Sequence, residues 1–269
     1  MQLVKPLPFP EAVSKLGQKS LIGSALSSSE WRDVPVALRE RAFFSSQVES
    51  ARVLQRARDG IADFLQSSRD ATAGDALKTG SRADFAKQMQ DFLKTEGIER
   101  TDGSLKDLAG EKRLGLIFDT QVRQANDYGY WKQGQDADVL DAFPAQRFIR
   151  VLEVKEQRDS HAQYEDGVWL KSDPIWTRIN DDFGTPYGPW GWGCGHDVED
   201  VSREEAEALG LLEPGQPVKP EKRDFATDAV ASTKPLDPDL LAKLLAELGD
   251  NVAYDAEAQT LRWKKQLPA

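Results

Sequence analysis

The chain of 269 residues is poor in thiol and imidazole groups, with one cysteine and two histidines. A single thiol excludes an intramolecular disulfide and a zinc site of four thiolates, so packing has to stabilise the fold. Long apolar runs are also missing, since no stretch approaches the roughly 18 residues that a membrane span requires. Three prolines among the first ten residues interrupt the apolar segment that a secretory signal peptide would need. We expect a soluble protein that is made in the cytoplasm and does not bind membranes.

Positive charge is in deficit as well. The 35 lysines and arginines are outnumbered by 45 aspartates and glutamates, which gives a formal net charge of -10. Such a chain is repelled by bare DNA unless its basic faces are segregated, which disfavours autonomous nucleic-acid binding. The glycines between residues 184 and 195 neither end in the GK[ST] pattern nor open a helix, so they do not form a phosphate-binding loop.

Hydrophobic periodicity predicts a mainly helical N-terminal region over residues 1–135. Apolar or small residues recur every three or four positions over residues 36–65, which we interpret as one long amphipathic helix. A capping box predicts a second helix that begins after Ser81 and ends near Gly97. The helical period also predicts a third helix over residues 111–132, and a short helix precedes these three near the N-terminus, over residues 11–16.

The composition changes after residue 135. A β-branched stretch over residues 148–154 predicts a strand, and four of the seven tryptophans lie in the turn-rich stretch 159–198 that follows. We therefore expect an α+β fold in which residues 136–201 form a small aromatic-rich α+β module. The rest, residues 202–269, is expected to be a C-terminal extension with an acidic helix, a polar linker, an amphipathic helix and a hairpin.

Both histidines and the cysteine fall within this aromatic-rich module, at His161, Cys194 and His196. Imidazole and thiolate are good zinc ligands, and Cys194 and His196 point to the same side if the chain is extended there. An oxygen ligand could come from Asp159, Asp173 or Asp197. The structural alternative is that the two histidines form hydrogen bonds with the backbone of loops, while Cys194 is a small buried residue that fills space in the core. A third interpretation is a catalytic Cys–His pair, which also needs an oxyanion stabiliser.

Acidic side chains cluster in the same region, at Glu156, Asp159, Glu165 and Asp166. Two carboxylates at a suitable separation could serve a hydrolase as acid and base. A solvated polar face explains these four residues better, so we do not expect them to be catalytic.

Three stretches of the chain carry motifs. The first consists of residues 7–13 with Lys19, Trp31 and residues 41–44, and the second is Ile117–Ala125 within the predicted third helix. The third joins residues 151–161, Gly167, Asp173–Trp176, Pro189 and Gly191–Cys194. Together they resemble the motifs of the phage Mu F-like minor head proteins, the phage head morphogenesis family, over residues 7 to about 201. The third stretch is close to the family pattern V-x-D-x-R-x-x-H, D-P-x-W and P-P-x-G-W-x-C-x-C.

Two positions depart from the family pattern. The final C-x-C is Cys194-Gly195-His196 here, and the aspartate of D-x-R is replaced by Lys155 or Glu156. The change from cysteine to histidine excludes a shared disulfide but keeps two side chains that can bind a metal. The resemblance fades beyond residue 201, so the C-terminal extension is unassigned.

The resemblance implies a minor capsid protein in the virion of a tailed phage or prophage, made in the host cytoplasm and without enzymatic activity. The implied partners are the portal protein and the major capsid or scaffolding protein, with genomic DNA as a further candidate and no membrane. No cofactor is implied, although zinc at His161, Cys194 and His196 stays open. A structural or interaction role falls to Trp169, Asp173, Trp176, Trp190, Gly191, Trp192 and Gly193. The alternatives are a metal-dependent hydrolase or nuclease that uses the same histidines and cysteine, and a DNA-binding head protein.

Overall fold

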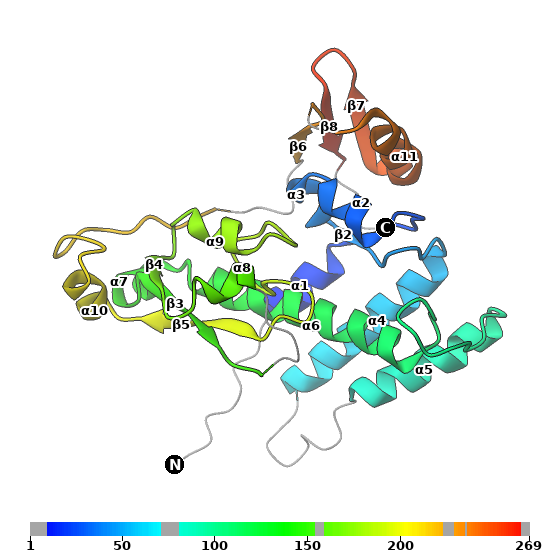
Figure 1. Ribbon diagram of the computed structural model, residues 1–269, viewed down its shortest axis with the longest axis horizontal. Coiled ribbons are helices and arrows are strands. Elements are labelled where there is room, and N and C mark those ends of the chain that lie inside the picture. The colour runs from blue at the N-terminus through cyan, green and yellow to red at the C-terminus, as the bar shows by residue number, and fades with distance from the viewer. Residues whose placement is uncertain (1–9, 71–80, 154–158, 223–228, 235, 265–269) are drawn as a thin grey trace. The chain divides into compact units, whose positions relative to one another are not determined.

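A computed structural model describes residues 10–70, 81–153, 159–222, 229–234 and 236–264 (Figure 1). The fold is α+β, as the sequence predicts. The chain divides into two compact units, the first made of Met1–Ala125 with Asp224–Ala269 and the second of Asn126–Arg223. This division differs from the three expected segments, because the C-terminal extension is shared between the two units. Within the described residues, no helix is long and apolar enough to cross a membrane.

The first unit contains a helical core of four helices. Helix α5 starts at a capping box, where Ser81 and Asp84 cap each other's backbone as predicted, and Gly97 follows its end with a φ of 76° that suits glycine. Apolar residues of the four helices share one buried cluster. The elements are α1 (Pro10–Gly17), α4 (Ala51–Asp70), α5 (Arg82–Thr95) and α6 (Glu111–Gln133), of which α6 continues past Ala125 into the second unit.

The single helix predicted over residues 36–65 is wrong. The structure has a one-turn helix α3 (Val36–Arg39), then a strand β2 (Ala42–Phe43), and only then α4. Strand β2 pairs in parallel with β1 (Ser20–Leu21), and Phe43 is fully buried in the core cluster of the four helices. Gln47 has a φ of 58°, which ends any helical path before α4. The apolar residues of this region have a helical spacing in the sequence, although they belong to two helices and a strand.

The C-terminal residues complete the first unit. Helix α11 (Pro238–Leu248) starts at the Asp237 cap, and its leucines share a core with Trp31 and Leu38 from near the N-terminus. The predicted hairpin forms as strands β7 and β8, and part of the expected linker forms a third strand, β6, next to β8. The remaining elements are α2 (Ser28–Asp33), β6 (Val230–Ser232), a 3-10 turn (Gly249–Asn251), β7 (Val252–Asp255) and β8 (Thr260–Trp263).

The second unit is built on a three-stranded antiparallel sheet with the order β4-β3-β5. Strand β3 starts three residues earlier than predicted and ends at Arg150, while residues 154–158 lie outside the described residues. Short helices join the strands, and a small core beneath the sheet includes Ala206 and Leu212. The elements are α7 (Ala137–Ala142), β3 (Ala145–Arg150), α8 (Asp159–Ala162), β4 (Val168–Leu170), α9 (Ile175–Ile179), β5 (His196–Val201) and α10 (Arg203–Ala208).

The acidic helix α10 therefore packs with the module and does not belong to a separate extension. Ser202 caps the start of this helix, since its Oγ accepts the Glu205 backbone N–H at 3.2 Å. The Glu205 carboxylate pairs with Arg147 on β3. Helix α10 is thus tied to the sheet by one ion pair and by Ala206 in the core.

Candidate metal centre

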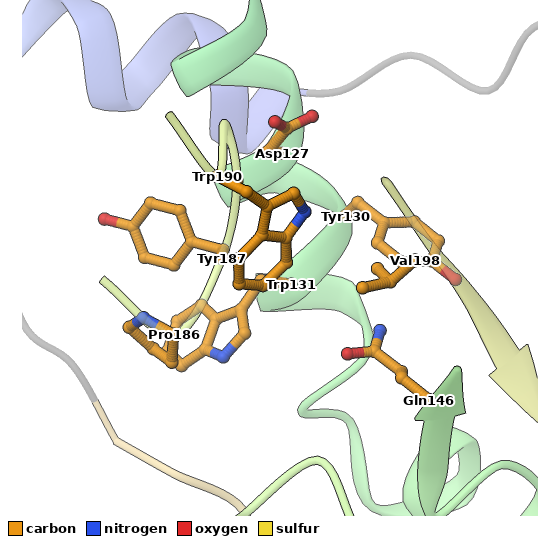
Figure 2. Close-up of a pocket in the computed structure, with 9 residues that line it drawn as sticks. Asp127, Tyr130, Trp131, Gln146, Pro186, Tyr187, Trp190 and Val198 are labelled. Atoms are coloured by element: carbon orange, nitrogen blue, oxygen red, sulfur yellow. The ribbon is translucent and has the colours of Figure 1, made fainter. Parts of the chain in front are cut away.

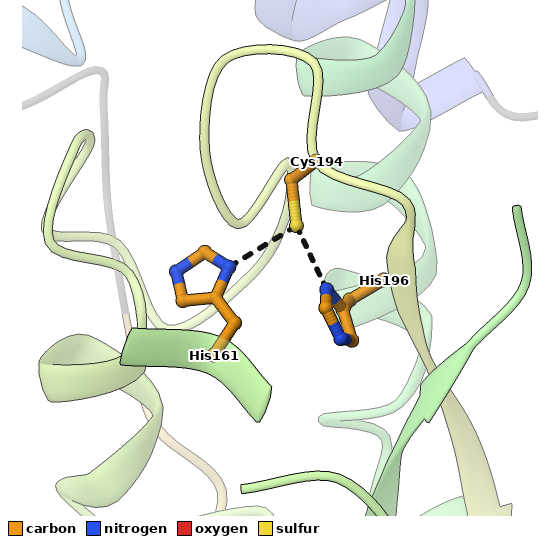
Figure 3. A group of neighbouring side chains, drawn as sticks. All are labelled: His161, Cys194 and His196. Carbon is orange, nitrogen blue, oxygen red and sulfur yellow. Dashed lines mark hydrogen bonds between the residues drawn. The ribbon is translucent and has the colours of Figure 1, made fainter. Parts of the chain in front are cut away.

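The second unit brings His161, Cys194 and His196 together (Figure 3). His161 comes from the single-turn helix α8, His196 is the first residue of β5, and Cys194 lies in the loop just before it. The Cys194 sulfur lies 3.2 Å from His161 Nδ1 and 3.1 Å from His196 Nδ1. The side chains are buried, with relative exposures of 0%, 6% and 2% in the order His161, Cys194, His196.

Backbone pairing and ring packing fix these positions. His196 pairs with Arg150 across the β3–β5 ladder, and the Gly195 carbonyl accepts the N–H groups of Val151 and Leu152 at 2.9 and 3.0 Å. The Phe148 ring stacks on the His196 imidazole at a centroid distance of 4.7 Å. The same ring meets the His161 imidazole edge-on at 6.1 Å, so both imidazole planes are held by one buried aromatic residue.

The outer ring nitrogens face carboxylates. His196 Nε2 lies 2.7 Å from Glu165 Oε1, which also accepts Arg150 Nε at 3.1 Å. His161 Nε2 lies 3.8 Å from Asp181 Oδ1. The hydrogen bond from His196, followed by that from Arg150, lowers the pKa of Glu165. An ionised Glu165 only accepts hydrogen bonds, so the proton in this contact is on His196 Nε2.

None of the aspartates considered as a fourth ligand joins this group. Asp159 is exposed on α8, Asp173 Oδ1 accepts the Ile175 N–H at 2.8 Å, and Asp197 Oδ1 accepts the Val198 N–H at 2.9 Å. The structure uses Glu165 instead, as a partner of a histidine. The Glu165 side chain keeps a relative exposure of 28% while it contacts His196, and Glu156 lies outside the described residues. Glu165 stands 31 positions before His196, so no local spacing could have indicated the pair.

The tryptophans form the core around this group. Trp176 and Trp190 have exposures of 0% and 1%, and their rings lie 5.6 Å apart. Trp169 is half-buried and meets Trp176 edge-on at 5.7 Å. Trp192 is also only half-buried and packs on Phe183 at 5.0 Å. Trp176 and Trp190 are therefore the anchors of the core.

The small residues of the motif shape the loop around this core. The Gly191 carbonyl accepts the Cys194 N–H at 3.2 Å, and Gly193 has a φ of 66° that favours glycine. Asp173 caps the start of α9 through its bond to Ile175. Of the residues expected to have a structural role, these three set the backbone path that delivers Cys194.

A small cavity lies in the same unit (Figure 2). Its volume is about 40 Å³, which is room for a few water molecules and far below the roughly 300 Å³ of a small-molecule site. His161, Cys194 and His196 are not among the residues that line it. The lining residues are Asp127, Tyr130, Trp131, Gln146, Pro186, Tyr187, Gly188, Trp190 and Val198.

The three facing atoms suit a borderline-soft cation chemically, because two imidazole nitrogens and one thiolate are the donors that Zn²⁺ prefers. They also meet the distance requirement of a Cys–His pair, but the sulfur is enclosed and no cavity described above reaches it. No family model, curated protein or solved structure matches this chain.

Proposed function

We propose that this protein is a minor head protein of a tailed phage or prophage, which acts through protein–protein contacts during head assembly. One observation carries the proposal: the most specific motif describes a single folded module. Its histidine, its cysteine and the residue at its last cysteine position are His161, Cys194 and His196, and these three meet in space. Its D-P-x-W segment contributes Trp176 to the core that includes Cys194. The motif residues are therefore positions that build one folded module.

The burial of these residues favours a scaffold over the hydrolase or nuclease alternative. A hydrolase needs its metal or thiol open to a substrate and to water, whereas the three side chains have exposures of 6% or less. A DNA-binding role is less well supported, because the acidic net charge of the chain opposes phosphate binding. The implied partners remain the portal protein and the major capsid or scaffolding protein.

The test is to look for the protein in particles. Phage or prophage particles from a strain that encodes this chain are purified on a density gradient, and the protein is quantified against the major capsid protein by mass spectrometry. We expect a few copies per head in the wild type, and a loss of both the protein and intact heads with Trp176→Ala. A matched variant on the half-exposed ring, Trp192→Ala, is the control and should retain more protein in particles. Normal yields of infectious particles that lack the protein would refute the proposal.

Assays on the purified protein distinguish the proposed function from the hydrolase and DNA-binding alternatives. Incubation with DNA and with ester or phosphodiester substrates, in the presence of Zn²⁺ or Mg²⁺, should give no turnover. Turnover that is abolished by Cys194→Ala would favour the hydrolase alternative instead. Binding to DNA that weakens steeply with salt would favour the DNA-binding alternative.

A further inference from the structure

We infer that the second unit binds one Zn²⁺ ion through His161 Nδ1, Cys194 Sγ and His196 Nδ1, and that this ion holds the unit together as a structural ion. The inference does not depend on the proposed function. It starts from the donor set, since the three facing atoms all lie within 4.8 Å of one another and come from the two residue types that bind zinc best.

The distances are close to those of a zinc centre. With ordinary Zn–S and Zn–N bond lengths, a tetrahedral ion separates a sulfur from a nitrogen ligand by about 3.6 Å. The two sulfur–nitrogen distances are 3.2 and 3.1 Å. An outward movement of a few tenths of an ångström therefore opens the group to the ion, from an arrangement in which His196 stacks on Phe148 and His161 meets the same ring edge-on.

The outer contacts have the arrangement that orients histidine ligands. A metal-binding histidine usually donates its other N–H to a carboxylate, a carbonyl or a water, which sets its tautomer. Glu165 does this for His196, with a 2.7 Å contact to Nε2. Asp181 lies 3.8 Å from His161 Nε2. Both imidazoles thus direct Nδ1 inward to the same sulfur atom, from opposite sides of the group (Figure 3).

The sequence positions of the three ligands support a structural role for the ion. His161 and Cys194 stand 33 positions apart, and the segment between them contains β4 with Trp169, α9 with Trp176 and the loop that carries Trp190. An ion bound to both ends of this segment and to β5 would close it, as a disulfide does in secreted proteins. The sequence has only one cysteine and cannot use a disulfide. Three protein ligands leave the fourth position of the ion to a water molecule, which the burial of the three side chains encloses.

The first experiment measures metal in the full-length protein purified without chelators from zinc-supplemented cells. We expect one zinc per chain by mass spectrometry of the metal. Replacement by Co²⁺ should give a thiolate-to-cobalt charge-transfer band, and because Cys194 is the only thiol, this band reports that residue alone. Protein that is folded but free of metal, and that gives no such band when titrated with Co²⁺, would overturn the inference.

Variants separate ligands from neighbours. Cys194→Ser should abolish the charge-transfer band, and His161→Ala should lower the zinc content well below one per chain. Asp197→Asn, which changes a carboxylate next to His196 that bonds only backbone in this structure, is the matched control and should keep one zinc. Glu165→Gln should keep the stoichiometry and weaken zinc binding by about 10- to 100-fold, the usual effect of losing an outer carboxylate. Equal zinc content in all four variants would refute the assignment.

Two further measurements use the wild-type chain. The first remains valid if the variants fail to fold, and the second tests whether the site is enclosed. A zinc indicator that competes with the wild-type protein gives the affinity without any substitution, and failure to retain zinc at nanomolar free metal would contradict a structural site. Azide added to the Co²⁺ form should leave its visible spectrum unchanged, since the three ligands are buried. A spectral shift would show that azide replaces the water at the fourth position, so that the site is accessible, and would overturn the structural role.

Discussion

Replacing Trp176 with alanine should destabilise the second unit much more than replacing the half-buried Trp192 with alanine. The Trp176 ring is fully buried and contacts the rings of Trp169 and Trp190. Its Nε1–H donates to the Leu170 carbonyl at 2.8 Å. That carbonyl also accepts the Asp173 N–H at 2.9 Å, so the substitution removes one hydrogen bond and does not strand a buried acceptor.

The magnitude follows from these contacts. Deleting a buried indole costs about 3 to 5 kcal/mol through lost burial and the cavity left behind, and the hydrogen bond adds about 1 kcal/mol. We expect Trp176→Ala to cost about 4 to 6 kcal/mol. Trp176→Phe keeps most of the ring and should cost about 1 to 2 kcal/mol. Trp192→Ala, at a half-buried ring, should cost about the same as Trp176→Phe, since little surface there is fully removed from water.

Hydrogen exchange read by mass spectrometry is the appropriate assay, because it reports the second unit separately from the first. The amides of β3 and β5 are the probes. A loss of about 4 kcal/mol corresponds to roughly a thousandfold faster exchange, at about 1.4 kcal/mol per factor of ten. If Trp176→Ala abolishes protection entirely, Trp176→Phe supplies the measurable value. Equal effects of Trp176→Ala and Trp192→Ala, or unchanged protection of β3 and β5 in Trp176→Ala, would refute the packing argument.

Two other predictions concern the first unit. Burial lowers the pKa of Lys19 from 10.5 to about 8, so the unfolded chain binds more protons between these values and stability should rise with pH there, by up to about 3 kcal/mol. The stability of the wild type relative to Lys19→Met, from urea titrations at about pH 7.5 and about pH 10, should increase accordingly, and a constant difference would contradict the assignment. A methyl group on Gly23 would lie 2.1 Å from the Glu49 carbonyl oxygen, so Gly23→Ala should lower the unfolding free energy by about 2 kcal/mol or more. An unchanged midpoint in urea would show that the backbone yields there.

The sequence predicted the helices whose ends are set locally. The helices over residues 82–95 and 111–133 follow from a capping box and an uninterrupted apolar period, and both signals act within a few residues. The region over residues 36–65 failed because its strand is defined by a partner about twenty residues earlier, at Ser20–Leu21. Strand β6 was missed for the same reason, since its three residues gain their structure only by pairing with β8.

The site shows the same limit. The rarity of histidine and cysteine was enough to single out His161, Cys194 and His196, but three rare residues in one stretch do not establish contact. Glu165 and Asp181 could not be assigned, because acidic residues are common and their positions depend on how the loops fold back on β3. The depth of Trp176 compared with Trp192 likewise depends on the loop path and not on residue type.

The lengths of its elements explain why the second unit concentrates aromatic rings and metal-type ligands in one place. Its strands have three to six residues, and α8 and α9 have four and five. Helices this short are not stable by themselves, since the cost of nucleation is recovered only over longer segments. The ordered structure of the second unit therefore has to come from contacts between side chains that are distant in sequence. The Trp176–Trp190 contact supplies this on one side and the His161–Cys194–His196 group on the other. Removing either should loosen the whole second unit, whereas α4, α5 and α6 of the first unit have their own apolar core.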